Sequence, residues 1–174
     1  MLLGIGVGWV EEESDAVGVE FSSRGQRCDE YVEAMRALWN DPVSTYQGKY
    51  VHFERVVSQP KPAAEGGVPI LVGGHTRAAA RRAGRLGDGF YPLGVFGPEL
   101  DELLAVMAES AREVGRNPDE IEITVAGAPD RNFAEACREQ GIGRFLISPP
   151  TGDLEDMRSG LESFRKEVIQ PMSG

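Results

Sequence analysis

The chain has 174 residues, enough for one domain with a hydrophobic core, and we expect a single domain over residues 1–174. Its formal net charge of −10 disfavours nucleic acid and anionic membranes as partners, because a protein binds these negatively charged surfaces through a local excess of Lys and Arg. No apolar stretch approaches the roughly 20 residues of a membrane helix, and the N-terminus lacks the basic and then apolar pattern of a signal peptide, so we expect a cytoplasmic protein.

The first third of the chain is predicted to contain one strand, one helix and an extended excursion. The strand covers residues 1–7, where glycines alternate with larger apolar residues and leave one face almost bare. Such a pattern often marks the close approach of a ligand or of another backbone. Residues 10–27 are polar, and we expect irregular structure there. Apolar residues at helical spacing predict a helix over residues 26–40. Residues 43–62 form the excursion, with a turn at Gly48 between two short strands.

Strands and helices alternate in the remainder of the chain. We predict strands at residues 69–72, 90–92, 121–125 and 144–147, and helices at residues 76–86, 98–114, 130–140 and 153–169. In the last helix we expect five apolar residues to face inward: Leu154, Met157, Leu161, Phe164 and Val168. Five strand–helix units indicate a parallel α/β sheet. A complete eight-fold barrel needs about 250 residues, so the pattern leaves an open sheet and an incomplete barrel as alternatives.

The most informative local feature is the junction between the strand at residues 69–72 and the helix that follows it. The apolar run stops at Gly73 and Gly74, and the helix begins directly afterwards. A glycine turn before a helix lets backbone N–H groups approach an anion, and the helix dipole favours negative charge there. The sequence therefore predicts a phosphate site with the Thr76 hydroxyl as a further contact. The alternative is that the glycines only make a tight turn and Thr76 only caps the helix.

Two further groups of residues stand near predicted strand ends. His75 and Arg77 lie close enough to the glycine turn to add positive charge beside a phosphate, whereas Arg81 and Arg85 are expected to form a solvated helix face. Gly6 and Gly8 end the first strand, where they leave space for a flat ring, and the Trp9 that follows them is more often a core residue in such a place.

Other side chains that often carry chemistry have structural interpretations here. Asp88 follows a helix and precedes a strand, and we expect it to stabilise that turn. Cys28 and Cys137 stand on separate predicted helices, and we expect reduced cysteines with a packing role. The spacing shows neither a nucleophile triad nor a metal-ligand motif. No catalytic residue can be assigned, and we expect no metal.

The ordered set of motifs resembles one known family. The matching pieces are Gly4-Ile-Gly-Val-Gly-Trp9, Tyr46-x-Gly48-x-Tyr50-x-x-Phe53, Pro69-Ile-Leu-Val-Gly-Gly74 and Gly87-Asp88-Gly89. In this order and spacing they resemble the bacterial luciferase-like monooxygenases, especially the branch that uses the deazaflavin coenzyme F-420. The resemblance covers residues 3–92 most distinctively.

The resemblance implies a fold and a cofactor. Members of the family are eight-stranded TIM-type (β/α)8 barrels that bind FMN or F-420 at the carboxyl ends of the strands. By this resemblance the chain is an incomplete TIM barrel of about five parallel strand–helix units, which correspond to strands four to eight. The cofactor-binding candidates are then Gly6, Gly8, Gly73, Gly74, His75, Thr76 and Arg77.

The implied function is that of an oxidoreductase or monooxygenase that uses F-420 or FMN and acts on a small-molecule substrate. The alternative is a non-catalytic module that binds the cofactor or assembles with itself. A five-strand sheet would expose at least one edge, and exposed edges are usually covered or paired. We therefore expect a homo-oligomer, such as a dimer, that forms through this edge.

Overall fold

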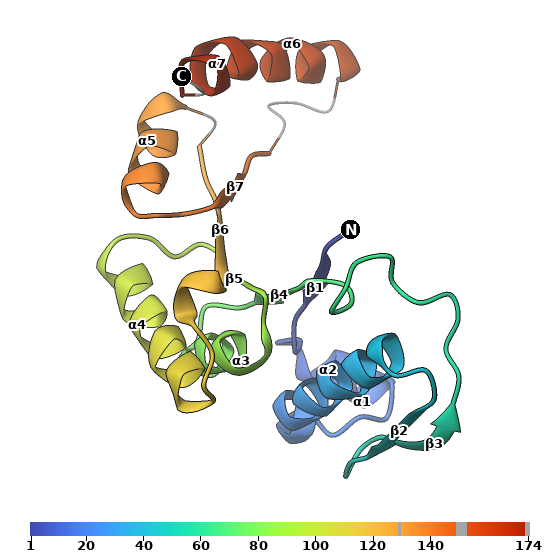
Figure 1. The fold of residues 1–174 in the computed structure, drawn as a ribbon. Coiled ribbons are helices and arrows are strands. Elements are labelled where there is room, and N and C mark those ends of the chain that lie inside the picture. The colour runs from blue at the N-terminus through green and yellow to red at the C-terminus, as the bar shows by residue number, and fades with distance from the viewer. Residues whose placement is uncertain (129, 149–152, 173–174) are drawn as a thin grey trace.

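The computed structural model describes residues 1–128, 130–148 and 153–172. Its centre is a sheet of five strands in the order β1-β4-β5-β6-β7 (Figure 1). The strands are β1 Leu3–Ile5, β4 Ile70–Gly73, β5 Gly89–Tyr91, β6 Glu122–Ala126 and β7 Arg144–Leu146. Each neighbouring pair runs parallel. The prediction of a parallel α/β sheet is thus confirmed.

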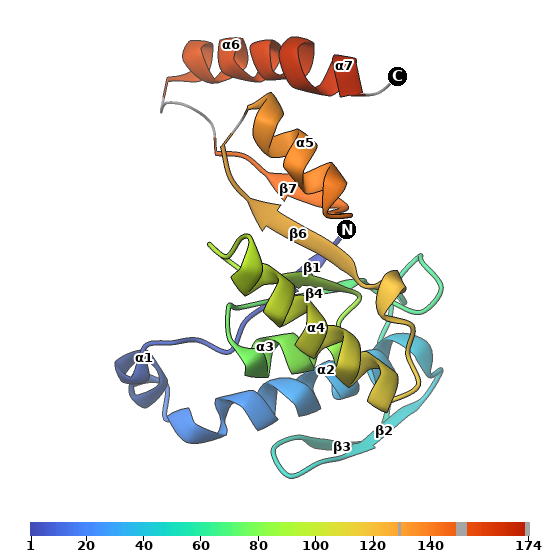
Figure 2. The ribbon, with the colours of Figure 1, turned by 90° about the vertical axis from the view of Figure 1, so that its left-hand side faces the viewer.

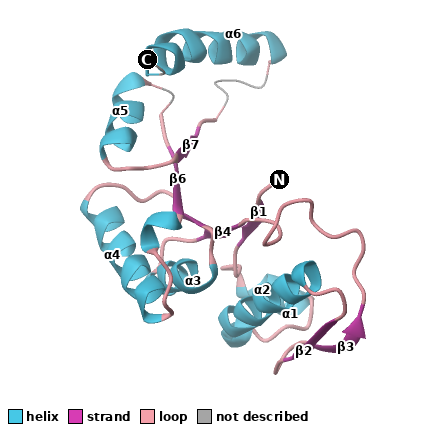
Figure 3. Ribbon diagram, viewed as in Figure 1, coloured by secondary structure: helices cyan, strands magenta, loops and turns pink. Residues whose placement is uncertain are grey.

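The main helices form an arc around one side of this sheet, and the other side stays free of helices (Figures 1 and 3). They are α2 Arg24–Asn40, α3 Arg77–Leu86, α4 Pro98–Glu113, α5 Arg131–Glu139 and α6 Leu154–Phe164. A π-helical stretch, Arg165–Ile169, and the short α7, Gln170–Met172, continue α6. No helix of the described residues is long and apolar enough to cross a membrane. The correspondence with strands four to eight of a barrel stays a prediction.

The core lies between the sheet and the arc of helices. Val72 and Phe90 point from the sheet toward α3 and α4, where they pack among buried alanine and leucine side chains. Small residues let these two helices approach closely: a Cβ atom added to Gly84 of α3 would overlap the carbonyl oxygen of Met107 in α4. Side chains alternate along a strand, so the neighbours of Val72 and Phe90 point to the helix-free side.

The predicted excursion contains an antiparallel hairpin, β2 Ser44–Gln47 and β3 His52–Val56, as the turn at Gly48 indicated. The hairpin lies on α2, held by the carboxylate of Glu30. This carboxylate accepts hydrogen bonds from the backbone N–H groups of Lys49 at 3.0 Å, Tyr50 at 2.7 Å and Val51 at 3.3 Å.

Residues 10–27 differ from the prediction of irregular structure. They contain α1 Glu11–Ala16 and a 3-10 turn, Phe21–Ser23, and α2 starts at Arg24. The first turn of α1 consists of three acidic residues, Glu11, Glu12 and Glu13, which the positive end of the helix dipole stabilises. Acidic residues suit a solvated segment, but they also favour a helix start.

The prediction about the apolar face of the last helix is partly wrong. In the last helix Val168 is buried, but Leu154 is 83% exposed and Leu161 is 50% exposed. In α4, Leu100, Leu103, Met107 and Ala111 are buried, whereas Val114 is 49% exposed, because the helix ends there and Gly115 turns the chain away with a positive φ of 74°. The exposed face of α6 has no partner within the described part of the chain that covers it.

Candidate functional site

The structure brings the two predicted glycine segments together. Strands β1 and β4 are neighbours, and Ile5 pairs with Val72, so Gly6 lies beside Gly73 at the carboxyl ends of both strands. A Cβ atom added to Gly73 would lie 3.3 Å from the Ile5 carbonyl oxygen. The two segments are more than sixty positions apart in the sequence, yet they form one continuous edge of the sheet.

The turn between β4 and α3 is built as a helix start. Gly74 has a φ of +128°, a conformation that residues with a side chain rarely adopt. The Thr76 hydroxyl accepts a hydrogen bond from the Ala79 N–H at 3.2 Å, so the capping role is confirmed. The N–H groups of Arg77 and Ala78 lie in the first turn, where a helix offers no intrahelical acceptor.

One detail differs from the predicted phosphate site. The N–H group of Gly74 donates to the Tyr91 carbonyl oxygen at 3.1 Å, so it already has an acceptor. Gly74 therefore shapes the turn, and the donors that remain for an anion come from the helix start. No acidic residue lies in the first turn of α3, while His75 and Arg77 are exposed there. Arg77 and the lack of acidic residues in this turn therefore favour the binding of an anion.

The arginines of α3 separate into two groups. Arg82 is buried and, together with Arg85, forms ion pairs with Asp29 of α2. The expectation that Arg85 belongs to a solvated face is therefore wrong, because its guanidinium lies 2.6 Å from an Asp29 oxygen. Arg77 and Arg81 are exposed. Of these two, Arg77 is the cation at the glycine turn.

The glycines of β1 and of the residues after it face open space. A Cβ atom added to Gly4, Gly6 or Gly8 would meet no atom within 4 Å. Crowding within the chain therefore does not explain these glycines, although Gly8 also needs its positive φ of 78°. Trp9 is 87% exposed, so the expectation that it belongs to the core is wrong. The end of β1 leaves room for a flat ligand.

The helix-free face of the sheet contains further side chains that the sequence did not single out. Tyr91 pairs with Gly73 and points to this face, because its neighbour Phe90 is fully buried on the other one. The alternation of Phe90 and Tyr91 along β5 was a signal that could have identified it. A row of Gly6, Gly73 and Tyr91 therefore crosses the face near the carboxyl ends of the strands.

The same face continues into a polar cluster on β6 and β7. Arg144 forms an ion pair with Glu122 at 2.6 Å, and its guanidinium donates to the Thr124 hydroxyl at 3.4 Å. Thr124 is fully buried beneath this pair. The alternation of polar and apolar residues from Glu122 to Ala126 indicates which side chains share this face, but the pairing with β7 needed the structure.

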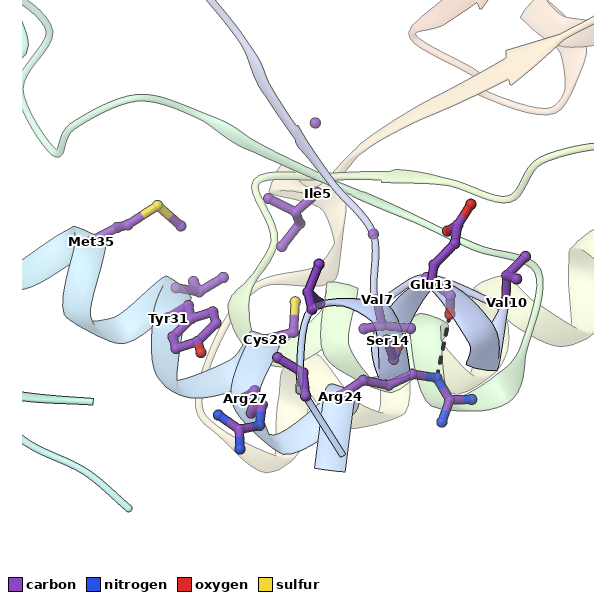
Figure 4. A pocket seen from close by; sticks show the side chains of 16 residues that line it. Ile5, Val7, Val10, Glu13, Ser14, Arg24, Arg27, Cys28, Tyr31 and Met35 are labelled. Carbon is purple, nitrogen blue, oxygen red and sulfur yellow. Dashed lines mark hydrogen bonds between the residues drawn. The ribbon is translucent and has the colours of Figure 1, made fainter. Parts of the chain in front are cut away.

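A cavity of about 600 Å³ lies beside β1, but it is not the predicted phosphate site (Figure 4). Its walls come from β1, α1 and α2, and they include Ile5, Val7, Tyr31 and Met35 but none of the residues 73–77. At its rim Arg24 donates from Nε to the Gly8 carbonyl oxygen at 3.3 Å. Gly6 and Gly8 of the predicted site also line this cavity, whereas Gly73 and Tyr91 do not.

The described residues hold no group of three or more His, Cys, Asp or Glu side chains that could bind a metal ion. Cys28 and Cys137 are both free thiols, half-buried and buried respectively, as the packing interpretation expected. Burial raises the pKa of both thiols, so neither is set up as a thiolate nucleophile. The candidate site offers backbone donors and an arginine, and no acid or base can be assigned in it.

Comparisons with known proteins agree with this fold. The family described as luciferase-like monooxygenase matches residues 1–162. An uncharacterised protein of Mycobacterium tuberculosis is 30% identical over 176 residues, which cover 96% of this chain and 60% of that protein. The F420-dependent glucose-6-phosphate dehydrogenase of Nocardia farcinica is 38% identical over 129 residues, which cover 70% of this chain and 38% of that enzyme.

A solved structure extends the likeness to three dimensions. The structure described as an F420-dependent secondary alcohol dehydrogenase in complex with an F420-acetone adduct matches with a TM-score of 0.64 at 21% identity. The match covers 96% of this chain and 61% of the other. At this identity the likeness shows the fold. The chain spans about 60% of the length of the curated relatives that it matches almost end to end.

Proposed function

We propose that this chain, which belongs to the luciferase-like monooxygenase family, binds coenzyme F-420 or FMN and serves flavin-type oxidoreduction. The observation that carries this proposal is the position of Gly6 beside Gly73, next to the start of α3. There the sheet offers a bare surface for a planar ring, and the helix offers N–H donors for a phosphate tail. We also propose that residues 1–174 act as one domain.

The phosphate would be held by this chain in three ways. The N–H groups of Arg77 and Ala78 would donate to its oxygens, and the helix dipole would add favourable potential. The Arg77 guanidinium would add a charge-assisted hydrogen bond. Thr76 and Gly74 would act indirectly, because the first caps the helix and the second sets the turn.

The ring would lie on the helix-free face, where Gly6 and Gly73 leave space and Tyr91 forms a wall. The bound deazaflavin or flavin supplies the hydride chemistry. The chain supplies binding and orientation, and we propose a small-molecule substrate on the open side of the ring. F-420 is the first choice, because the Nocardia farcinica relative is named for it; FMN is the alternative that the family resemblance implies.

The proposal is tested by titrating the purified chain with F-420 and with FMN while the fluorescence of each cofactor is followed. The Arg77→Ala variant should weaken binding about tenfold, the equivalent of about 1.4 kcal/mol. Arg81→Ala is the matched control, since Arg81 is another exposed arginine one turn further along the same helix. It should bind like the wild type. If neither cofactor binds, or if both variants lose affinity alike, the proposed site is wrong.

Turnover is tested separately with reduced and oxidised F-420. Glucose 6-phosphate and a secondary alcohol are suitable first substrates, since relatives or structural neighbours are named for them. Hydride transfer, followed by the absorbance of the deazaflavin, supports the oxidoreductase. Binding without transfer to any member of a wider substrate panel supports the non-catalytic cofactor-binding module instead. Self-association and a cytoplasmic location stay predictions.

A further inference from the structure

The hydrogen-bonded ladder between β1 and β4 ends before the candidate site is complete. Its last pair is Ile5 with Val72, and the chain continues beyond this pair on both sides. Both continuations contain a glycine with a positive φ, Gly8 at 78° and Gly74 at 128°. Because glycine restrains the backbone least, the ring-binding and phosphate-binding parts of the site need further contacts to hold them at a fixed separation.

Arg24, in the first turn of α2, holds the segment that follows β1 (Figure 4). Its Nε donates to the Gly8 carbonyl oxygen at 3.3 Å, and its Nη1 donates to the Phe21 carbonyl oxygen at 2.8 Å. The central carbon of its guanidinium also lies 3.6 Å from the centre of the Phe21 ring. These contacts orient the guanidinium and attach the backbone of Gly8 to the start of α2.

The same turn of α2 also holds α3, the helix whose start is the proposed phosphate site. The buried Arg82 donates from Nη2 to the Gly25 carbonyl oxygen at 3.0 Å and from Nε to the Asp29 carboxylate. Glycine is needed for this contact, since a Cβ atom added to Gly25 would lie only 3.0 Å from Nη2 of Arg82. A larger residue would therefore push this guanidinium away from the start of α2.

Because Arg24 and Gly25 are consecutive, these contacts form one continuous connection from the end of β1, through the start of α2, to α3. Figure 2 shows the arrangement: α3 lies above the first half of α2, with α1 beside the start of α2. A cofactor with its ring at Gly6 and its phosphate at the start of α3 would bind at both ends of this connection.

We propose that Arg24, acting through Gly25 and Arg82, is a positioning residue that fixes the separation between the ring-binding and phosphate-binding parts of the cofactor site. The inference rests on the proposed function, because it needs a ligand that occupies both parts. A ligand that binds two subsites at once gains affinity only when its length matches their separation. Loss of the Arg24 contacts spreads this separation and weakens the binding of the whole cofactor, whereas each part still binds its own fragment.

The test compares the affinities for F-420, for the same deazaflavin ring without its phosphate-bearing tail, and for inorganic phosphate. Calorimetry measures the first two and NMR titration the third. Arg24→Ala should weaken F-420 binding at least about fivefold and leave the affinities for the ring and for phosphate unchanged. Gly25→Ala should act in the same direction through Arg82, although alanine favours the helix. If FMN is the cofactor that binds, FMN and riboflavin replace F-420 and its ring.

Arg36→Ala is the matched control. Arg36 also lies on α2 and also donates to a backbone carbonyl oxygen, that of Leu86 at 2.9 Å, but Leu86 is the last residue of α3 and lies far from the proposed phosphate site. Its loss should lower the thermal stability without changing the affinity for F-420. Circular dichroism checks that each variant is folded at the temperature of the titrations.

The outcomes separate this inference from the proposed function. If the wild type binds F-420 and both Arg24→Ala and Gly25→Ala bind it equally well, the positioning role is wrong and the proposed function stands. An equal loss in Arg36→Ala would show general loosening of the fold, and a loss of affinity for the ring alone would show direct contact; either result overturns the positioning role. A wild type that binds neither F-420 nor FMN refutes the proposed function and this inference with it.

Discussion

At the scale of single residues, the arginines of α3 show both what a sequence pattern predicts and what it leaves out. Arg77 and its place at the glycine turn follow from local spacing. The roles of Arg82 and Arg85 do not, because their partner Asp29 lies more than fifty positions earlier on α2. No local pattern connects such residues, and only the packing of α2 against α3 brings them together. Arg82 also donates to the Gly25 carbonyl oxygen at 3.0 Å, which fixes α3 against the start of α2.

Asp29→Ala should destabilise the fold by about 2 kcal/mol, because it leaves the buried Arg82 guanidinium without its carboxylate. The free energy of unfolding in urea measures the effect. Glu135→Ala is the control, since the Arg131–Glu135 pair is an exposed pair one helical turn apart, and it should change stability by less than about 0.5 kcal/mol. Equal effects of the two changes would refute a structural role for the Asp29 pair.

At the scale of elements, the hairpin was predicted from its turn, but its attachment was not. Glu30 lies on α2 and accepts from three consecutive N–H groups of the hairpin turn, while the Tyr46 hydroxyl donates to Glu33 at 2.7 Å. Burial and this bond to Glu33 raise the pKa of Tyr46 to about 12. Glu30 differs: burial raises its pKa, but the N–H donors of Tyr50, Lys49 and Val51 outweigh burial and lower it.

The hairpin should therefore detach in acid. A carboxyl group with a lowered pKa in the folded state contributes stability above its ordinary value of 4.5, and this contribution is lost as the pH falls through the folded value. Glu30→Gln should remove the effect and speed amide exchange at Tyr50 and Val51 severalfold at neutral pH. Hydrogen exchange read by NMR measures this, with Glu54→Gln on exposed β3 as the control. Unchanged protection at Tyr50 in Glu30→Gln would contradict the role of this carboxylate.

The contact between α3 and α4 depends on Gly84. Helix propensity alone favours Ala over Gly by roughly 1 kcal/mol, but a Cβ atom at this position overlaps the Met107 carbonyl oxygen, and backbone cannot move aside cheaply. We expect Gly84→Ala to be destabilising by about 1–2 kcal/mol in net terms. Thermal unfolding measures this loss of stability. Gly4→Ala is the control, because the added Cβ atom there meets nothing within 4 Å. A stabilised Gly84→Ala variant would show that propensity decides.

At the scale of the whole molecule, the parallel sheet could be predicted, because short apolar runs alternate with amphipathic helices, whereas this alternation left the choice between an open sheet and an incomplete barrel open. The exposure of Leu154 and Leu161 could not, since periodicity shows which side chains form an apolar face but not whether anything covers it. The candidate site, too, could be predicted only in part. The glycine turn is local in sequence and was predicted, whereas Tyr91 joins it only because β5 lies next to β4. Neighbouring strands are a property of the fold.

If the start of α3 binds the phosphate of a flavin-type cofactor, this contact should be visible in a comparison of two affinities. The affinity of the chain is measured by calorimetry for F-420 and for the same deazaflavin ring without its phosphate-bearing tail. We predict that the phosphate-bearing form binds at least about tenfold more tightly, a difference of about 1.4 kcal/mol, and that Arg77→Ala reduces this ratio. Equal affinity for the two forms, or a ratio that Arg77→Ala leaves unchanged, would show that the start of α3 does not bind the phosphate.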